Sequence, residues 1–302
     1  MQSIARRRFL QTIPALAITA RGVALARPAD RVAARVATPD RAGTESVLAL
    51  GLRPVGAAPV DFYREMGGSP PMPTDIPNVG YPVEPNLEVL KSLSPDLIVT
   101  GTITESVRQM LARVAPVFSL EIYTGAVGAY ARAIAEFRRL AEAVGRVQEA
   151  EAYVSGLEIQ IERAAATLQA GGGRSAYLVT LDAGGRSMTV YGRNSIMYDV
   201  MTKMGIANAW DGPTNGYGFT AAGIQKLAAR PDADLIYVDY GLETQAALER
   251  LKNSPFWNDL PMVRAGRTRA IPLFDVFGSL PLARSFALGL ERAYAEKGAR
   301  RG

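Results

Sequence analysis

The sequence predicts an α/β protein of two similar Rossmann-like lobes, each a parallel sheet flanked by helices, joined by a single long α-helix. Three observations predict this fold. Short β-like runs alternate with amphipathic helical segments, which is typical of parallel α/β sheets. Two helix–strand units occur in the same order in each half of the chain. A helical pattern of about six turns separates the two halves.

The first repeated unit is a helix ended by glycine and followed by a short strand. It covers residues 46–57 in the first half and residues 198–210 in the second, with Gly51 and Gly205 as the helix ends. The second unit, residues 86–99 and 223–238, is a helix, a turn with proline and aspartate, and a buried strand. Helix–glycine–strand units are common in any α/β protein, so it is their repetition in order that favours two related lobes over one sheet.

The segment between the halves, residues 147–170, carries apolar side chains at helical spacing, and three glycines at 171–173 end the pattern. Such a helix spans roughly 35 Å at 1.5 Å per residue and would act as a stiff strut. We therefore expect an N-terminal lobe over residues 27–146, a linking helix over 147–171 and a C-terminal lobe over 172–302. The loop over residues 62–85, rich in proline and glycine, is expected to be irregular and to form one wall of a cleft.

The N-terminus has the pattern of a twin-arginine export signal. Residues 6–8 are arginines followed by two bulky apolar residues, and an A-x-A cleavage site ends at Ala26. The apolar stretch between them, residues 13–20, is shorter than the ~20 residues that span a bilayer. We expect a signal peptide over residues 1–26, export by the twin-arginine pathway, cleavage near Ala26 and a periplasmic location. A basic N-terminal arm is the alternative.

Composition excludes several classes of chemistry. The chain has no cysteine and no histidine, which excludes disulfides, thiol nucleophiles, a lipidated cysteine, Ser-His-Asp catalysis and imidazole-bound metals or haem. Residues 1–26 hold four arginines and no acidic residue, so the formal charge of +5 falls to +1 without them. We therefore expect no nucleic-acid partner, because phosphate binding needs clustered basic residues.

Six segments in a fixed order carry a resemblance to a known family: residues 45–51, 78–80 with 84–88, 110–116, 191–195, 205–215 and 263–267. Through them the chain resembles the periplasmic ferric-hydroxamate siderophore-binding proteins of iron-uptake ABC transporters. The resemblance implies a monomeric, non-enzymatic protein that captures a ferric siderophore between its lobes. It would deliver the chelate to an inner-membrane permease and its ATPase. No cofactor and no direct bond from protein to iron are expected, because siderophore oxygens fill the octahedral shell.

The resemblance also places the ligand site, where this chain departs from its relatives. Pro82 and Thr104 stand where ferrichrome-binding members have an arginine and a tyrosine that hold the hydroxamates. Met66, Tyr217 and Asp275 replace tryptophans, and Phe277 replaces a tyrosine. The particular chelate is therefore left open.

A bulky chelate needs aromatic surface and a few oriented polar groups. By alignment with the cleft of the family, the aromatic surface would come from Tyr63, Tyr81, Tyr217 and Phe277. The polar groups would be Thr104 and Asn215, at the rim of the cleft. Tyr63, Tyr81 and Tyr217 can equally be structural, and Phe277 can equally belong to the core.

Two charged residues follow predicted strands, where ligands bind in open α/β sheets. Arg41, in the loop after a strand over residues 32–38, would replace the missing arginine and bind hydroxamate or carboxylate oxygens. Asp275, after a strand over 270–274, would balance a cationic chelate. A solvated loop arginine and a turn carboxylate are the alternatives.

Importer docking in the wider class uses one acidic residue on each lobe. The first-lobe position matches Glu88, whereas the second holds Gln225. Such rim charges mainly affect encounter rates, and Glu88 can also be a plain surface carboxylate. Competing functions are a binding protein for cobalamin or a citrate-type siderophore, and an exported enzyme using Asp, Glu, Tyr or Lys.

Overall fold

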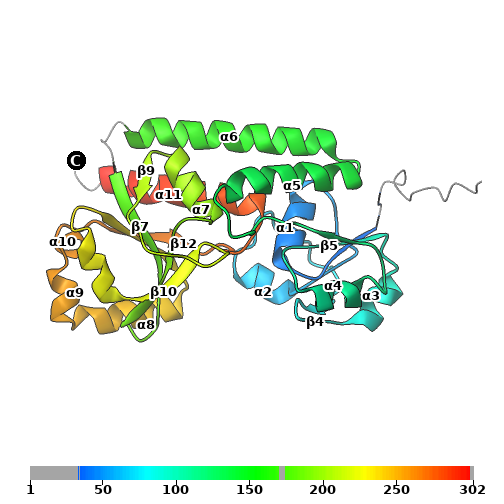
Figure 1. The fold of residues 1–302 in the computed structure, drawn as a ribbon, viewed down its shortest axis with the longest axis horizontal. Helices are drawn as coiled ribbons and strands as arrows, with labels where there is room; N and C mark the ends of the chain where they lie inside the picture. The colour runs from blue at the N-terminus through cyan, green and yellow to red at the C-terminus, as the bar shows by residue number, and fades with distance from the viewer. Residues whose placement is uncertain (1–32, 34, 170–173, 300–302) are drawn as a thin grey trace, which may run out of the picture. The chain divides into compact units, whose positions relative to one another are not determined.

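The computed structural model describes residue 33, residues 35–169 and residues 174–299 (Figure 1). Contacts divide the chain into residues 1–31 and residues 32–302, and the described residues all lie in the second unit. The predicted signal peptide and its cleavage site lie outside the described residues. Among the residues that are described, no helix has the length and apolar character that a membrane crossing requires.

The first half is built on a four-stranded parallel sheet in the order β2-β1-β5-β6. Its strands are β1 (Val36–Thr38), β2 (Gly56–Ala57), β5 (Leu97–Thr100) and β6 (Val117–Ser119). Its helices are α1 (Arg41–Ala49), α2 (Val60–Glu65), α3 (Leu87–Leu93), α4 (Glu105–Leu111) and α5 (Ala129–Ala143).

The second half repeats this strand order and adds two further strands. Four parallel strands follow the order β9-β7-β11-β12, in which the long β7 takes the place of β1. Two antiparallel strands, β8 and β10, extend the sheet beside the C-terminal part of β7. The strands are β7 (Arg174–Leu181), β8 (Ser187–Tyr191), β9 (Ile206–Asn208), β10 (Phe219–Gly223), β11 (Asp234–Asp239) and β12 (Thr268–Pro272). The predicted pair of related lobes is confirmed.

The repeated helix–strand units are present, with one difference. Gly51 and Gly205 have φ of 71° and 74° where α1 and α7 (Ile196–Lys203) end. Glycine adopts positive φ without steric cost, so these two residues end the helices as the sequence predicts. In the second unit, α3 begins at a cap in which Asn86 Oδ1 accepts a hydrogen bond from Val89 N. Its counterpart is not an α-helix but the 3₁₀-helix η1 (Ile224–Ala229), which Gly223 precedes without any side chain to cap it.

The linking helix is α6 (Val147–Gln169), which runs along both halves in Figure 1. It packs against α5, α7 and α11 (Leu280–Ala299). Of its predicted apolar positions, Tyr153 is half-buried and the others are buried: Ala150, Val154, Leu157, Ile161, Ala164, Ala165 and Leu168. All of these except Ala165 belong to one apolar core, with Tyr153 packed against it, and that core also contains Leu50 of the first half and Phe286 of the second. The two halves therefore share a core across α6.

The segment expected to be irregular, residues 62–85, is only partly so. Residues 62–65 belong to α2, and β3 (Gly80–Tyr81) pairs with β4 (Glu84–Pro85) in a small antiparallel hairpin. The prediction is wrong at both ends. At the first end Tyr63 packs with Met72 and Ile76 in an apolar cluster, and at the second the chain forms the β3–β4 pair. The remaining helices, α8 (Leu242–Lys252), α9 (Pro255–Asp259) and α10 (Pro261–Arg264), lie in the second half.

Candidate functional site

The site begins at the turn between β1 and α1, which Asp40 organises. As the N-cap of α1, its Oδ1 accepts a hydrogen bond from Gly43 N at 2.7 Å. Its Oδ2 accepts hydrogen bonds from Gly101 N at 2.7 Å and from the Thr100 hydroxyl, at the end of β5. Burial raises the pKa of Asp40, and the hydrogen bond from Thr100 acts against this rise. Asp40 therefore fixes the carboxyl ends of two neighbouring strands.

An ion pair between Arg41 and Asp275 joins the two halves. Arg41 is not in a loop, as the sequence suggested, but is the first residue of α1, because the helix begins directly after Asp40. Its Nη2 lies 2.9 Å from Asp275 Oδ1, and its guanidinium lies 4.9 Å from the centre of the Phe62 ring. Asp275 lies three residues beyond β12, and its Oδ1 also accepts a hydrogen bond from Phe277 N at 3.1 Å.

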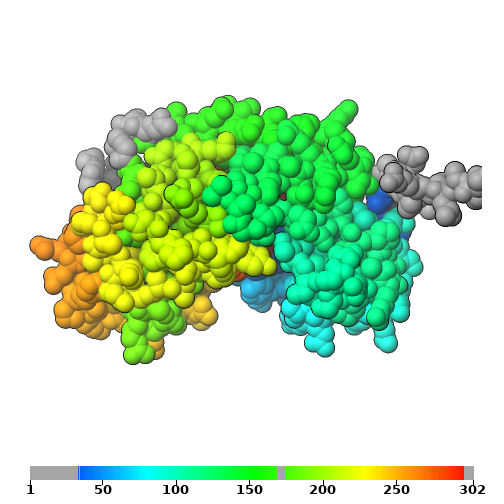
Figure 2. Space-filling model, in the orientation of Figure 1, coloured from blue at the N-terminus to red at the C-terminus, as the bar shows by residue number. Residues whose placement is uncertain are grey.

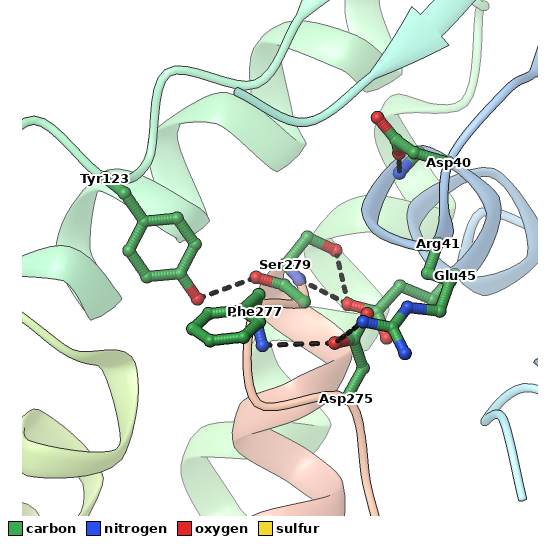
Figure 3. A network of polar contacts seen from close by, with 9 residues as sticks. Asp40, Arg41, Glu45, Tyr123, Asp275, Phe277 and Ser279 are labelled. Atoms are coloured by element: carbon green, nitrogen blue, oxygen red, sulfur yellow. Dashed lines mark hydrogen bonds and ion pairs between the residues drawn. The ribbon is translucent and has the colours of Figure 1, made fainter. Parts of the chain in front are cut away.

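A second contact between the halves lies one helical turn further along α1 (Figure 3). Glu45 Oε1 accepts hydrogen bonds from Ser279 N and, at 3.0 Å, from the Ser279 hydroxyl. The hydroxyls of Ser46 and Ser279 lie 2.6 Å apart. Gly278 faces the Glu45 carboxylate so closely that a Cβ there would clash with it. Burial and then the Asp275 charge raise the pKa of Glu45 well above its usual value.

Aromatic side chains form the other side of the site. The Tyr123 hydroxyl donates a hydrogen bond to Gly278 O at 2.8 Å, and burial raises the pKa of Tyr123 well above 10. The Tyr123 and Tyr217 ring centres lie 5.5 Å apart, and Tyr217 meets Phe277 edge-on at 6.0 Å. Tyr217 and Phe277 remain 39% and 38% exposed, so their outer faces are free to contact a ligand.

These groups surround a cleft between the halves, with about 540 Å³ of empty space including its mouth. The space-filling view shows the surface indented between the cyan segments of the first half and the yellow segments of the second (Figure 2). The cleft lies where β1, β5 and β12 end, as the rule for open α/β sheets predicts. Its lining is formed by Asp40, Arg41, Ala42, Pro82, Gly101, Thr102, Ile103, Tyr123, Tyr217, Asp275 and Phe277.

Four of the predicted ligand residues therefore meet at the cleft: Arg41, Tyr217, Asp275 and Phe277. Tyr63 is 3% exposed, and its hydroxyl donates to Pro70 O at 2.7 Å. It lines a smaller cavity behind the Arg41–Asp275 pair. Tyr81 is 65% exposed on the β3–β4 hairpin and does not line the cleft, although its neighbour Pro82 does.

The remaining predicted residues have local structural contacts. Thr104 caps α4, with its hydroxyl accepting from Val107 N, while its neighbour Ile103 lines the cleft. Asn215 Oδ1 accepts hydrogen bonds from Tyr217 N at 2.9 Å and Phe219 N at 3.3 Å, which shapes the turn that carries Tyr217. Glu88 is exposed in the first turn of α3. The ligand and docking roles of all these residues remain predictions.

Sequence reasoning missed Asp40, Glu45, Tyr123 and Ser279. A signal existed for Asp40, because an Asp three residues before Gly43 at the end of a predicted strand is a typical N-cap. The other three act through long-range contacts, which no local sequence pattern reveals. Tyr123 and Gly278 are 155 positions apart, and Glu45 and Ser279 are 234 positions apart.

The fold and the cleft between its halves define a binding protein of two α/β lobes bridged by a long helix. Residues 36–272 match the family described as periplasmic binding protein, and the chain belongs to that family. It is 32% identical over 253 residues to the iron(3+)-hydroxamate-binding protein FhuD of Escherichia coli K12, with 84% of each chain covered. It is 24% identical to the Fe(3+)-citrate-binding protein YfmC of Bacillus subtilis, over 74% of this chain and 68% of that one.

Solved structures agree on the fold. The Fe³⁺-Desferal-bound siderophore-binding protein FhuD of Vibrio cholerae superposes with a TM-score of 0.78 at 24% identity, covering 86% of this chain and 97% of that one. Staphylococcus aureus SirA complexed with staphyloferrin B superposes with a TM-score of 0.64 at 18% identity, covering 88% and 94%.

Proposed function

We propose that this protein is the periplasmic substrate-binding component of an ABC importer for a ferric siderophore of the hydroxamate type. The observation that carries the proposal is the cleft between the lobes, which is lined both by exposed aromatic faces and by an Arg–Asp pair. The 32% identity to the hydroxamate-binding protein of Escherichia coli over most of both chains supports the ligand class. Iron is the cargo in this function, and the protein performs no catalysis.

The lining residues would take complementary roles. Tyr217 and Phe277 would pack against the aliphatic linkers of the chelate, and Arg41 would face its oxygen-rich edge. Asp275 would balance the charge of a cationic chelate. Pro82 and Ile103, the neighbours of Tyr81 and Thr104, line the cleft, and Asn215 accepts a hydrogen bond from Tyr217 N, so these three residues would act at the periphery or indirectly. Tyr63 would support Arg41 from behind. All iron coordination sites would remain with the siderophore.

The wider setting is also part of the proposal. Residues 1–26 would direct export by the twin-arginine pathway and be removed near Ala26. A monomer would then consist of a lobe over residues 27–146, the helix over 147–171 and a lobe over 172–302. Glu88, exposed on α3, would contribute to docking on the inner-membrane permease, whose ATPase drives import.

Titration of the purified protein with ferrioxamine B, ferrichrome, coprogen and ferric citrate, followed by quenching of intrinsic fluorescence, tests the proposal. We expect saturable one-to-one binding of at least one hydroxamate chelate. Tyr217→Ala should weaken that binding by about 1–3 kcal/mol, because the variant loses an aromatic contact that the bound chelate would bury. Phe256→Ala is a matched control, since Phe256 is 40% exposed on α9 and does not line the cleft. Quenching by none of the hydroxamates would contradict the proposal.

A further inference from the structure

The charged side chains of the cleft are unevenly balanced. Of the described residues that line it, Arg41 is the only cationic one, whereas Asp40 and Asp275 are acidic. The Arg41 guanidinium is held by Asp275 at 2.9 Å, and the two side chains are 21% and 10% exposed. The one positive group that could attract an anionic ligand is therefore already neutralised inside the cleft.

The surroundings make this pairing hard to exchange for a ligand. Asp275 is mostly buried, and the neighbouring acidic groups are Asp40 at the lining and Glu45 behind it. An anionic ligand that drew Arg41 away would leave the Asp275 carboxylate buried without a counter-ion, which is strongly unfavourable. A ligand that left the pair intact would bring its own negative charge toward two carboxylates.

We infer that Asp275 is a specificity-determining residue, which withholds Arg41 from anionic ligands so that the cleft selects neutral or cationic ferric chelates over polyanionic carboxylate chelates. The inference rests on the proposed function and concerns which chelates the same cleft admits. A cationic chelate would be attracted by the carboxylate charge that Arg41 does not neutralise. A neutral chelate would depend on contacts with the aromatic faces, and an anionic ferric carboxylate complex would be repelled.

The test compares Asp275→Asn with the wild-type protein. The substitution keeps the shape of the side chain and an oxygen that can accept the Phe277 N–H, but it removes the charge. Dissociation constants are measured for ferrioxamine B, which is cationic, ferrichrome, which is neutral, and ferric citrate, which is anionic. For D275N we expect at least a tenfold change in the ratio of ferrioxamine B to ferric citrate affinity, in favour of citrate, with ferrichrome affinity changed less.

Asp239→Asn is a matched control. Asp239 ends β11, the strand beside β12, and its Oδ1 accepts Gly241 N in the same i,i+2 pattern by which Asp275 accepts Phe277 N. It carries the same charge but does not line the cleft. We expect D239N to leave the ratio within about twofold of wild type, because solvent and ions screen a charge outside the site.

The outcomes separate the inference from the proposed function. Binding of none of the three chelates by the wild-type protein would overturn the proposed function and the inference with it. Hydroxamate binding with equally tight ferric citrate binding, or equal ratios in wild type, D275N and D239N, would overturn the inference alone. If D275N unfolds, as judged by circular dichroism, Asp275→Ser supplies the same comparison, and the wild-type ranking of the three chelates decides by itself.

Discussion

Two regions hold the halves of this protein together, and they do so by different physics. Around α6 the contact is apolar, and Leu157 lies in one continuous core with residues from both sheets. At the cleft the contact is polar, through the Arg41–Asp275 pair and the hydrogen bonds between Glu45 and Ser279. Apolar burial is strong but non-directional, whereas ion pairs and hydrogen bonds demand particular geometry. The apolar region therefore sets stability, and the polar region sets the shape and charge of the site.

The largest effect on stability is expected from a substitution in the apolar region. Leu157→Ala should lower the free energy of unfolding by about 2–5 kcal/mol, because it leaves a cavity in the shared core. Ile159→Ala on the same helix, where the side chain is 48% exposed, should change it by less than about 0.5 kcal/mol. Urea denaturation with a common m-value measures both. Equal effects of the two substitutions would show that α6 does not bury this face.

A smaller effect is expected in the polar region. Glu45→Ala should cost about 1–3 kcal/mol of unfolding free energy, since it leaves the buried Ser279 N–H without its acceptor. Glu45→Gln is the control, because its amide oxygen can still accept that hydrogen bond. The same denaturation experiment compares them. A glutamine variant as unstable as the alanine variant would mean that the charge of Glu45, rather than its hydrogen bonds, joins the halves.

The smallest effect is the pH dependence of stability that Glu45 gives to the polar region. The pKa of Glu45 is raised in the folded state, so the native protein binds a proton more tightly there than the unfolded chain does. Its contribution to stability is therefore full below the unfolded pKa of about 4.5 and is lost as pH rises toward the folded pKa. Relative to E45Q, the wild type should lose at most about 1.4 kcal/mol between pH 5 and pH 6. Facing groups such as Arg41, Asp40 and Asp275 are present in both proteins, so a difference that stays constant with pH would refute this assignment.

Much of the fold could be predicted because it is encoded locally. The spacing of Leu157 and Ile161 along α6, and the glycines at 51 and 205, report helix faces and helix ends within a few residues of sequence. The exceptions have tertiary causes. The segment around Tyr63 is ordered by its own small cluster. Arg41 begins a helix because Asp40 is the N-cap of α1 and is itself held by the backbone N–H of Gly101, just beyond β5.

The site could be predicted only in part. Tyr217, Phe277 and Asp275 follow from the resemblance to a known family and from their places near strand ends. The pairing of Asp275 with Arg41 could not be predicted, because 234 positions separate the two and the pairing depends on how the halves meet. The same reason hid Glu45, whose partner Ser279 is equally distant in sequence.

The most direct test of the central claim is a crystal structure of the complex with a ferric hydroxamate, with iron located by its anomalous scattering. We expect one iron position in the cleft, with Tyr217 and Phe277 against the organic shell and no protein oxygen within bonding distance of the metal. Iron bound directly by side-chain oxygens, or located away from the Arg41–Asp275 pair, would contradict it.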